Sequence, residues 1–305
     1  MKHSSATEES AFSRVELAVV LAVAAILAAL LIPMTSRARA QAQWTQCMNN
    51  HRQLILAWRL YVAQSKDDLP SAKGGPYAWM NGWMDYSPGN RANWDPTADI
   101  MQSPLWPFCH SNAGLFKCPS DPSVARVGPS QVRTLLQVGG VQLQLVAGGS
   151  TNAPRIRSVS MLNWVGGRCG PDGAPDDMGY SNTRHGTTSG EYRTYYRASD
   201  MVTPGPARTF VFVDERMDSI NDGMFVTDML TYPAATEDIC DLPAQYHDGA
   251  ANFSYADGHA EVKKWTTPLL LAAPSAVTIQ PFPTDLNGFS PDAFWLMDHA
   301  TRLIP

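Results

Sequence analysis

The hydrophobic pattern of the chain is dominated by one uninterrupted run near its start. Residues 17–32 are all Ala, Val, Leu or Ile, and Pro33 closes the run. As a helix rising about 1.5 Å per residue, the run would cover most of the roughly 30 Å hydrocarbon core of a bilayer. The pattern therefore predicts a membrane-spanning helix, with Glu16 as the carboxylate that borders it.

A helical pattern continues beyond this run. Residues 35–65 are rich in Ala, Gln, Arg and Leu and contain neither Gly nor Pro, which favours a helix. Apolar residues recur there at spacings of seven, four and three, which places them on one face: Cys47, Leu54, Trp58 and Tyr61. The sequence therefore predicts one continuous helix of about fifty residues.

The second half of the chain carries strand patterns and a terminal helix. Residues 157–164 have a strand-like pattern, and residues 209–214 combine β-branched and aromatic side chains, as buried strands do. Pro291 and Asp292 are typical of the first turn of a helix, so a final helix is expected there.

A β-hairpin is predicted around Asp257-Gly258. Both residues tolerate the positive φ that a two-residue hairpin turn requires. Such a turn pairs Tyr255 with Ala260 and Phe253 with Val262, so both apolar pairs lie on one face of the hairpin.

Composition narrows the class of protein. With 305 residues, 44% of them hydrophobic, the chain can bury one sizeable core or two small ones. The net charge is −5 and the basic residues are scattered, so no nucleic-acid partner is expected. The five cysteines show no CxxC and no zinc-ligand spacing.

The start of the chain resembles a known export signal. A polar leader of residues 1–11 is followed by Phe12, by Glu16 four residues later, and by the apolar run that ends at Pro33. This arrangement resembles the class III signal of type IV pilins and type II secretion pseudopilins. The resemblance implies that a prepilin peptidase cuts between Ala11 and Phe12 and methylates the new amine. A plain signal anchor or signal peptide is the alternative.

Two further motifs point to the same group. Residues 47–54 (CMNNHRQL) resemble the C-x-N-N-x-x-Q-L helix of pseudopilin-like proteins, and residues 115–121 (LFKCPSD) resemble their L-x-x-C-P-x-D segment. His247 lies ten residues before Asp257-Gly258, as in the H-x9-D-G family of such proteins. We expect His247, Asp257 and Gly258 to be structural, since the turn geometry explains Asp257 and no nucleophile motif is present.

The resemblance implies an α+β, pilin-like fold, in which a long N-terminal transmembrane helix packs on an antiparallel β-sheet with long loop insertions. It divides the chain into a leader (1–11), a transmembrane and filament-core helix (12–33), an amphipathic extension (34–66) and an extracytoplasmic globular domain (67–305). The expected location is the inner membrane, crossed once, with the globular domain in the periplasm or on a cell-surface filament.

The expected function is structural rather than enzymatic. Copies of the chain would bundle their apolar helices into a type II secretion or type IV pilus-like filament, with Glu16 meeting the Phe12 amine of a neighbour. The expected partners are other copies of the chain, prepilin peptidase, the secretion or pilus assembly machinery, and the membrane. No cofactor is expected apart from candidate calcium ligands at Asp214, Asp218 and Asp222. Export would also permit a disulfide, for which Cys109 and Cys118 are the closest pair in sequence.

Two other functions remain open. In the first, the chain is a monomeric, membrane-anchored binding domain that holds a glycan or a partner with the aromatic side chains of residues 71–107; these side chains can equally fill the core. In the second, which is the less favoured, His247 and Asp257 serve an anchored hydrolase.

Overall fold

A computed structural model describes residues 14–128, 144–145, 151–167, 192–229, 231–236, 238–275, 278–279, 284–286 and 288–304. The chain divides into two units, residues 1–42 and residues 43–305. We call the second the globular unit. The division falls inside the long N-terminal helix instead of at residue 67, because the helix from residue 43 onward packs within the globular unit.

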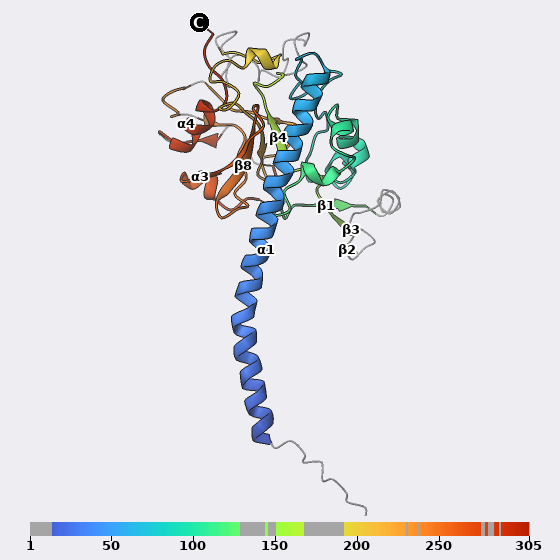
Figure 1. The fold of residues 1–305 in the computed structure, drawn as a ribbon, viewed down its shortest axis with the longest axis vertical. Helices are drawn as coiled ribbons and strands as arrows, with labels where there is room; N and C mark the ends of the chain where they lie inside the picture. Colours follow the sequence, from blue (N-terminus) through green and yellow to red (C-terminus); the bar gives the residue numbers. More distant parts are fainter. Residues whose placement is uncertain are drawn as a thin grey trace, which may run out of the picture. The chain divides into compact units, whose positions relative to one another are not determined.

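The predicted long helix is confirmed. Helix α1 (Arg14–Gln64) contains 51 residues and is drawn in blue in Figure 1. Pro33 lies within it. The helix ends just before Lys66 and Asp67, which adopt φ values of 56° and 79° and so leave the helical conformation.

The membrane-spanning prediction is wrong. Within the described residues, no helix combines the length and the apolar character that a membrane crossing requires. About 20 predominantly apolar residues are needed to span the hydrocarbon core, and the run of residues 17–32 is shorter than that. This finding overturns the transmembrane helix of the predicted fold class and the single-pass inner-membrane location.

The central sheet of the globular unit has the strand order β6-β4-β5-β8-β9. Its strands are β4 (Val159–Leu162), β5 (Phe210–Asp214), β6 (Met224–Phe225), β8 (Ala250–Tyr255) and β9 (Ala260–Lys264). Neighbouring strands are antiparallel except β4 and β6, which are parallel. The sheet is therefore mixed, and not antiparallel as predicted. The chain reverses direction after β5, and β6 then pairs with the edge of β4 that faces away from β5.

Both faces of this sheet are covered, and neighbouring residues of β8 show how. Ser254 Oγ lies 3.4 Å from Nδ1 of His51 on α1. Phe253 points to the other face, where its ring centroid lies 4.9 Å from that of Trp295 on α4 (Pro291–Asp298). All residues of β5 and β8 are consequently buried, and the predicted C-terminal helix α4 is confirmed (Figure 1).

Short elements surround the central sheet. Two small sheets contain β1 (Val124–Val127), β2 (Gln144–Leu145), β3 (Thr151–Pro154), β7 (Asp238–Ile239) and β10 (Thr284–Asp285). The other helices among the described residues are single turns: η1 (Arg91–Asn93), η2 (Pro96–Ala98), η3 (Ile100–Gln102), η4 (Trp106–Phe108), η5 (Ala113–Phe116), η6 (Ala198–Asp200) and α3 (Pro268–Leu271).

The β8–β9 hairpin is confirmed, but its predicted register is wrong by one residue. Ser254 pairs with Ala260, so the loop is longer than the predicted two-residue turn. Because β8 is buried on both faces, its alternation of apolar and polar residues does not specify the register. Gly258 has a φ of 102°, a backbone conformation that residues with a Cβ rarely adopt, so this position favours glycine.

Candidate functional site

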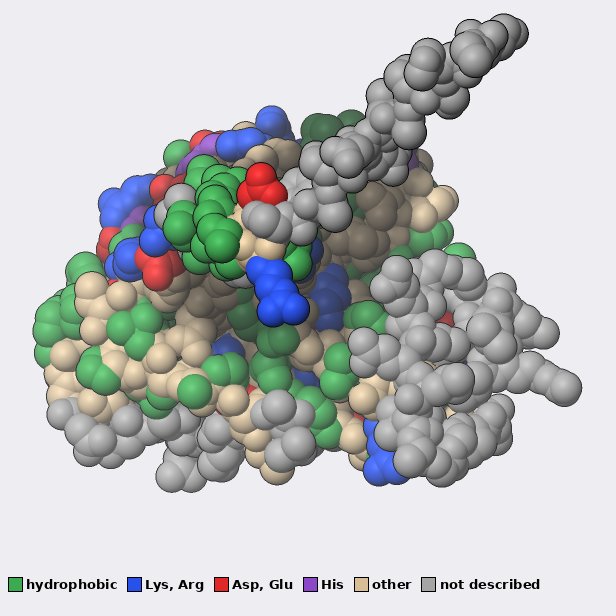
Figure 2. All heavy atoms as spheres, turned by 90° about the horizontal axis from the view of Figure 1, so that it is seen from below, with side chains coloured by type: hydrophobic (Ala, Val, Ile, Leu, Met, Phe, Trp, Pro, Cys, Tyr) green, Lys and Arg blue, Asp and Glu red, His purple; other side chains and the backbone are tan. Residues whose placement is uncertain are grey.

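The first candidate site is the apolar surface of α1 within residues 14–29. All side chains described in this stretch are exposed, and the large hydrophobic ones are between 50% and 73% exposed: Val15, Leu17, Val19, Val20, Leu21, Val23, Ile26 and Leu27. Figure 2 looks along the helix from its N-terminal end and shows mostly hydrophobic side chains there. A helix that is hydrophobic on all sides normally lies buried against other elements, whereas this surface is exposed.

Glu16 lies in the first turn of α1, where a carboxylate interacts favourably with the helix dipole. Ala11 and Phe12, the predicted processing and assembly residues, lie outside the described residues. Their roles, and that of Pro33, stay predictions.

The second candidate site is a group of four buried side chains in the globular unit, which we call the Cys–Asp–His cluster: Cys47, Cys118, Asp214 and His247. Cys47 lies on α1, and Asp214 is the last residue of β5. Cys118 follows η5, and His247 precedes β8. One potential ligand atom from each of the four residues lies within 4.8 Å of all the others.

The contacts inside the cluster converge on one point. The thiol of Cys47 donates to Asp214 Oδ2 at 3.1 Å. Nε2 of His247 lies 3.3 Å from Cys118 Sγ and 4.0 Å from Asp214 Oδ2. A Cys–His–Asp catalytic relay needs the carboxylate on the opposite ring nitrogen, Nδ1, from the nucleophile. Here the Cys118 thiol and the Asp214 carboxylate both face Nε2 of His247, so the arrangement resembles a set of metal ligands and not a catalytic relay.

Neighbouring side chains hold the cluster in place. Nε2 of His51 lies 3.2 Å from Asp214 Oδ1, and Asn252 Nδ2 donates to Asp214 Oδ2 at 3.1 Å. The indole of Trp44 stacks on the ring of His247, with 5.8 Å between ring centroids. These contacts fix both the carboxylate and the imidazole.

Burial and neighbouring charges set the protonation of the cluster. Burial raises the pKa of the Cys47 and Cys118 thiols and lowers the pKa of His247. Burial acts to raise the pKa of Asp214 as well, but the adjacent His51 and several hydrogen bonds outweigh it, and the net shift is downward. Without a metal, the cluster therefore consists of neutral thiols, a neutral imidazole and an ionised carboxylate.

The three candidate calcium ligands do not form a common site. Asp214 belongs to the Cys–Asp–His cluster, and Asp222 pairs with Lys73 at 2.5 Å. Asp218 accepts two hydrogen bonds from the guanidinium of Arg216, at 2.6 and 3.2 Å. Calcium requires several oxygens around one point, and the structure gives each of these carboxylates a different partner. Calcium binding stays a prediction.

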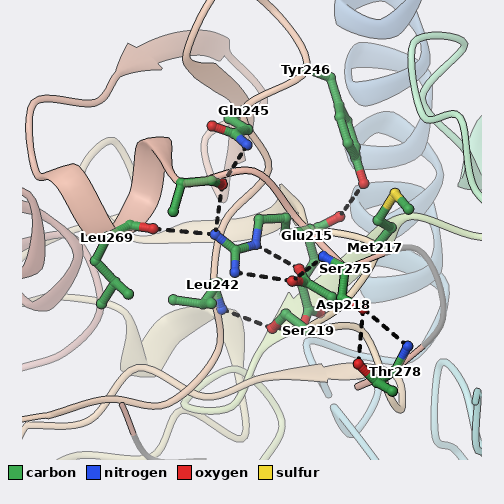
Figure 3. Close-up of polar contacts among 12 residues, drawn as sticks. Glu215, Met217, Asp218, Ser219, Leu242, Gln245, Tyr246, Leu269, Ser275 and Thr278 are labelled. Atoms are coloured by element: carbon green, nitrogen blue, oxygen red, sulfur yellow. Dashed lines mark hydrogen bonds and ion pairs between the residues drawn. The ribbon is translucent and has the colours of Figure 1, made fainter. Parts of the chain in front are cut away.

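Arg216 connects the end of β5 to α3, because its guanidinium contacts Asp218 as well as the chain at α3. Figure 3 shows the polar contacts around Asp218. Besides binding Asp218, its guanidinium donates to the carbonyl oxygens of Leu269 and Ala272 at 3.2 and 3.4 Å. The backbone N–H of Ser275 also donates to Asp218, at 2.8 Å. This acidic residue, predicted as a calcium ligand, therefore has a structural role in holding the chain after α3.

Glu215, which follows β5 directly, makes stability depend on pH. Burial raises its pKa from the ordinary 4.5 to about 8, although hydrogen bonds with Ser160 and Ser219 lower it. The folded state thus keeps a proton that the unfolded chain releases above pH 4.5. This contribution to stability is complete below pH 4.5 and is lost as the pH rises to about 8.

We therefore expect the Tm of the protein to fall between pH 5 and pH 9, and the fall to be smaller in Glu215→Gln, whose amide stays neutral. Thermal unfolding followed by circular dichroism at both pH values measures this difference. Asp248→Asn is the matched control, because the Asp248 side chain is 91% exposed and its variant should keep the wild-type fall. Equal falls in wild type and Glu215→Gln would contradict the assignment.

The predicted disulfide between Cys109 and Cys118 is not formed. Both residues are free, buried thiols. Cys118 is directed to His247, whereas Cys109 packs in the hydrophobic core, where burial raises its pKa to about 12. Closeness in sequence did not predict a disulfide here, because the two side chains pack in different parts of the interior.

The signature residues separate into two places. His247 belongs to the buried cluster, while the Asp257 carboxylate lies in the hairpin loop, 2.6 Å from Nδ1 of His259. The structure thus gives His247 and Asp257 different partners and does not bring them together as an acid–base pair. Sequence reasoning missed that Cys47 and Cys118 meet His247, since 129 residues separate Cys118 from His247. The motifs around these residues were the only available signal.

The aromatic side chains between positions 71 and 107 mostly fill the interior. Trp79 and Trp94 are fully buried, whereas Trp83 and Tyr77 are 49% and 66% exposed. The Lys73 ammonium lies 4.9 Å from the centroid of the Trp83 ring. Only a small part of the aromatic set is therefore available to a ligand.

Comparison of the chain with protein-family models, with curated proteins and with solved structures produces no match.

Proposed function

We propose that the protein is a structural subunit that assembles with copies of itself through the N-terminal half of α1, as a pilin- or pseudopilin-like filament. The observation that carries this proposal is the exposed apolar surface of residues 14–29, which belongs to a unit separate from the globular core. A protein that kept this surface in water would be prone to associate.

The energetics favour association between identical helices. Removing a Val, Leu or Ile side chain from water stabilises a complex by about 1.5–3 kcal/mol per fully buried residue. A second copy of the chain presents the same apolar surface, so a bundle of such helices buries them mutually. The resemblance to pilins adds prepilin peptidase and an assembly machinery as partners, and a contact of Glu16 with the neighbouring subunit.

The substitution Leu21→Asp should abolish assembly of the full-length protein. Leu21 is 61% exposed on α1, and a carboxylate buried in a helix bundle costs on the order of 3 kcal/mol, about a hundredfold in affinity per contact. Electron microscopy and sedimentation velocity measure the polymer. Leu56→Asp is the matched control: Leu56 is 55% exposed on the same helix but within the globular unit, and its variant should assemble normally.

Polymers of wild-type length from Leu21→Asp would contradict the proposal. So would a wild-type protein that stays monomeric at high concentration, which would favour a binding domain that uses Trp83 and Tyr77 on its surface. Mass spectrometry of the same preparation reads the N-terminus: a methylated Phe12 supports pilin-like processing, and an intact Met1 contradicts it.

A further inference from the structure

The Cys–Asp–His cluster has the composition and geometry of a metal centre. We propose that Cys47, Cys118, Asp214 and His247 bind one Zn²⁺ as a closed, structural site. This inference is independent of the proposed assembly, which involves a different part of α1.

The distances fit a tetrahedral ion. Bond lengths of about 2.3 Å to sulfur and about 2.0–2.2 Å to nitrogen or oxygen place tetrahedral ligand atoms roughly 3.3–3.8 Å apart. In the cluster, Cys47 Sγ to Asp214 Oδ2 is 3.1 Å, and His247 Nε2 is 3.3 Å from Cys118 Sγ and 4.0 Å from Asp214 Oδ2. Small side-chain movements around the point that the four atoms surround are enough to coordinate the ion.

The donor atoms select the metal. Calcium and magnesium prefer six or more oxygen ligands, whereas two cysteine sulfurs and one imidazole nitrogen suit zinc. Binding converts both thiols to thiolates and releases their two protons to solvent. With the carboxylate, the ligands then carry three negative charges against the two positive charges of the ion, as in many thiolate-rich zinc sites.

The site is closed to substrates. All four side chains are buried, and together they supply the four ligands that a structural zinc site uses. Catalytic zinc sites keep one position for water or substrate, and this arrangement leaves none. The bound ion would therefore stabilise the fold and would not take part in a reaction.

Groups outside the ligand set support coordination. The backbone N–H of Ser120 donates to Cys118 Sγ at 3.4 Å, which favours the thiolate. His51 and Asn252 orient the Asp214 carboxylate, and Trp44 packs on the His247 ring. Partners of this kind fix the ligands of metal sites and tune their affinity.

The position of the site gives it a structural purpose. An ion there would connect α1 to the end of β5 and to the segments before β8 and after η5, closing loops of more than a hundred residues. Three of the four ligands lie in the C-x-N-N, L-x-x-C-P-x-D and H-x9-D-G motifs, at Cys47, Cys118 and His247. Zinc binding supplies a common chemical reason for the Cys and His of these motifs.

The first experiment measures metal in the full-length protein, purified without a metal-affinity step from cells grown with zinc. Elemental analysis should find one zinc per chain. Replacing zinc with Co²⁺ should produce tetrahedral d–d bands and a thiolate-to-cobalt charge-transfer band. Chelation should lower the Tm by about 5–10 °C, because the ion binds only the folded chain.

The second experiment uses matched cysteine variants. Cys47→Ala and Cys118→Ala should each lose the zinc and the charge-transfer band, whereas Cys109→Ala, which removes an equally buried thiol outside the cluster, should keep both. If the cluster variants fail to fold, the cobalt spectrum of the wild type still tests whether thiolates coordinate the metal. A folded wild type with less than about one zinc per ten chains after zinc incubation would overturn the proposal, as would a cobalt spectrum without thiolate bands. A Cys47–Cys118 disulfide in the native protein would overturn it as well.

Discussion

Asp214→Ala should destabilise the globular unit by about 3–5 kcal/mol, because it removes the buried carboxylate on which several polar groups depend. The Asp214 side chain is fully buried and accepts hydrogen bonds from the Cys47 thiol and the Asn252 amide. Without it, these donors and the adjacent His51 lose their partner in an environment without water. Urea unfolding in a buffer with chelator measures the loss without any contribution from bound metal.

Asp248→Ala is the control for this prediction. Asp248 forms an ion pair with Lys264 at 2.9 Å, but both side chains are mostly exposed, so its removal should change stability little. A loss below about 1 kcal/mol for Asp214→Ala, similar to that of the control, would show that the carboxylate is not the centre of this network.

Phe253→Ala should have a similarly large effect, about 3–5 kcal/mol, through lost packing. The fully buried ring of Phe253 has its centroid 5.1 Å from that of Phe210, 6.0 Å from that of Trp265 and 4.9 Å from that of Trp295. Its removal leaves a cavity between the central sheet and α4, because large rings cannot collapse to fill it. Urea unfolding and the Tm both measure the loss.

Phe253→Leu provides the graded control. Leucine keeps most of the apolar volume, so this variant should lose clearly less stability than Phe253→Ala. Equal losses in the two variants would indicate that the aromatic geometry, and not the filled volume, determines the stability of this face.

Local sequence patterns predicted well those elements that depend on residues close together in the chain. The segment of residues 35–65 has strong helix formers and no Gly or Pro, which favours a helix from local sequence alone, and α1 confirms it. The run at residues 209–214 is apolar enough to be a buried strand in any arrangement, and β5 confirms it. The Pro291 start of α4 is equally local.

Local patterns failed for features that depend on contacts between distant parts of the chain. The register of the β8–β9 hairpin could not be read from alternation, because α1 covers one face of β8 and α4 covers the other. The length of the apolar run suggested a membrane crossing, which the described helices do not support. The disulfide was inferred from sequence distance, which says nothing about the direction of a buried side chain.

The amino-acid sequence was sufficient for the long helix, the buried strand β5, the presence of the β8–β9 hairpin and the terminal helix, since each depends on residues within a few positions of one another. The tertiary structure alone decided that Cys47, Cys118, Asp214 and His247 share one buried point. The residues of that cluster are separated by up to 200 positions. Only the packing of α1 against the central sheet brings them together, because no local propensity relates side chains so far apart in the chain.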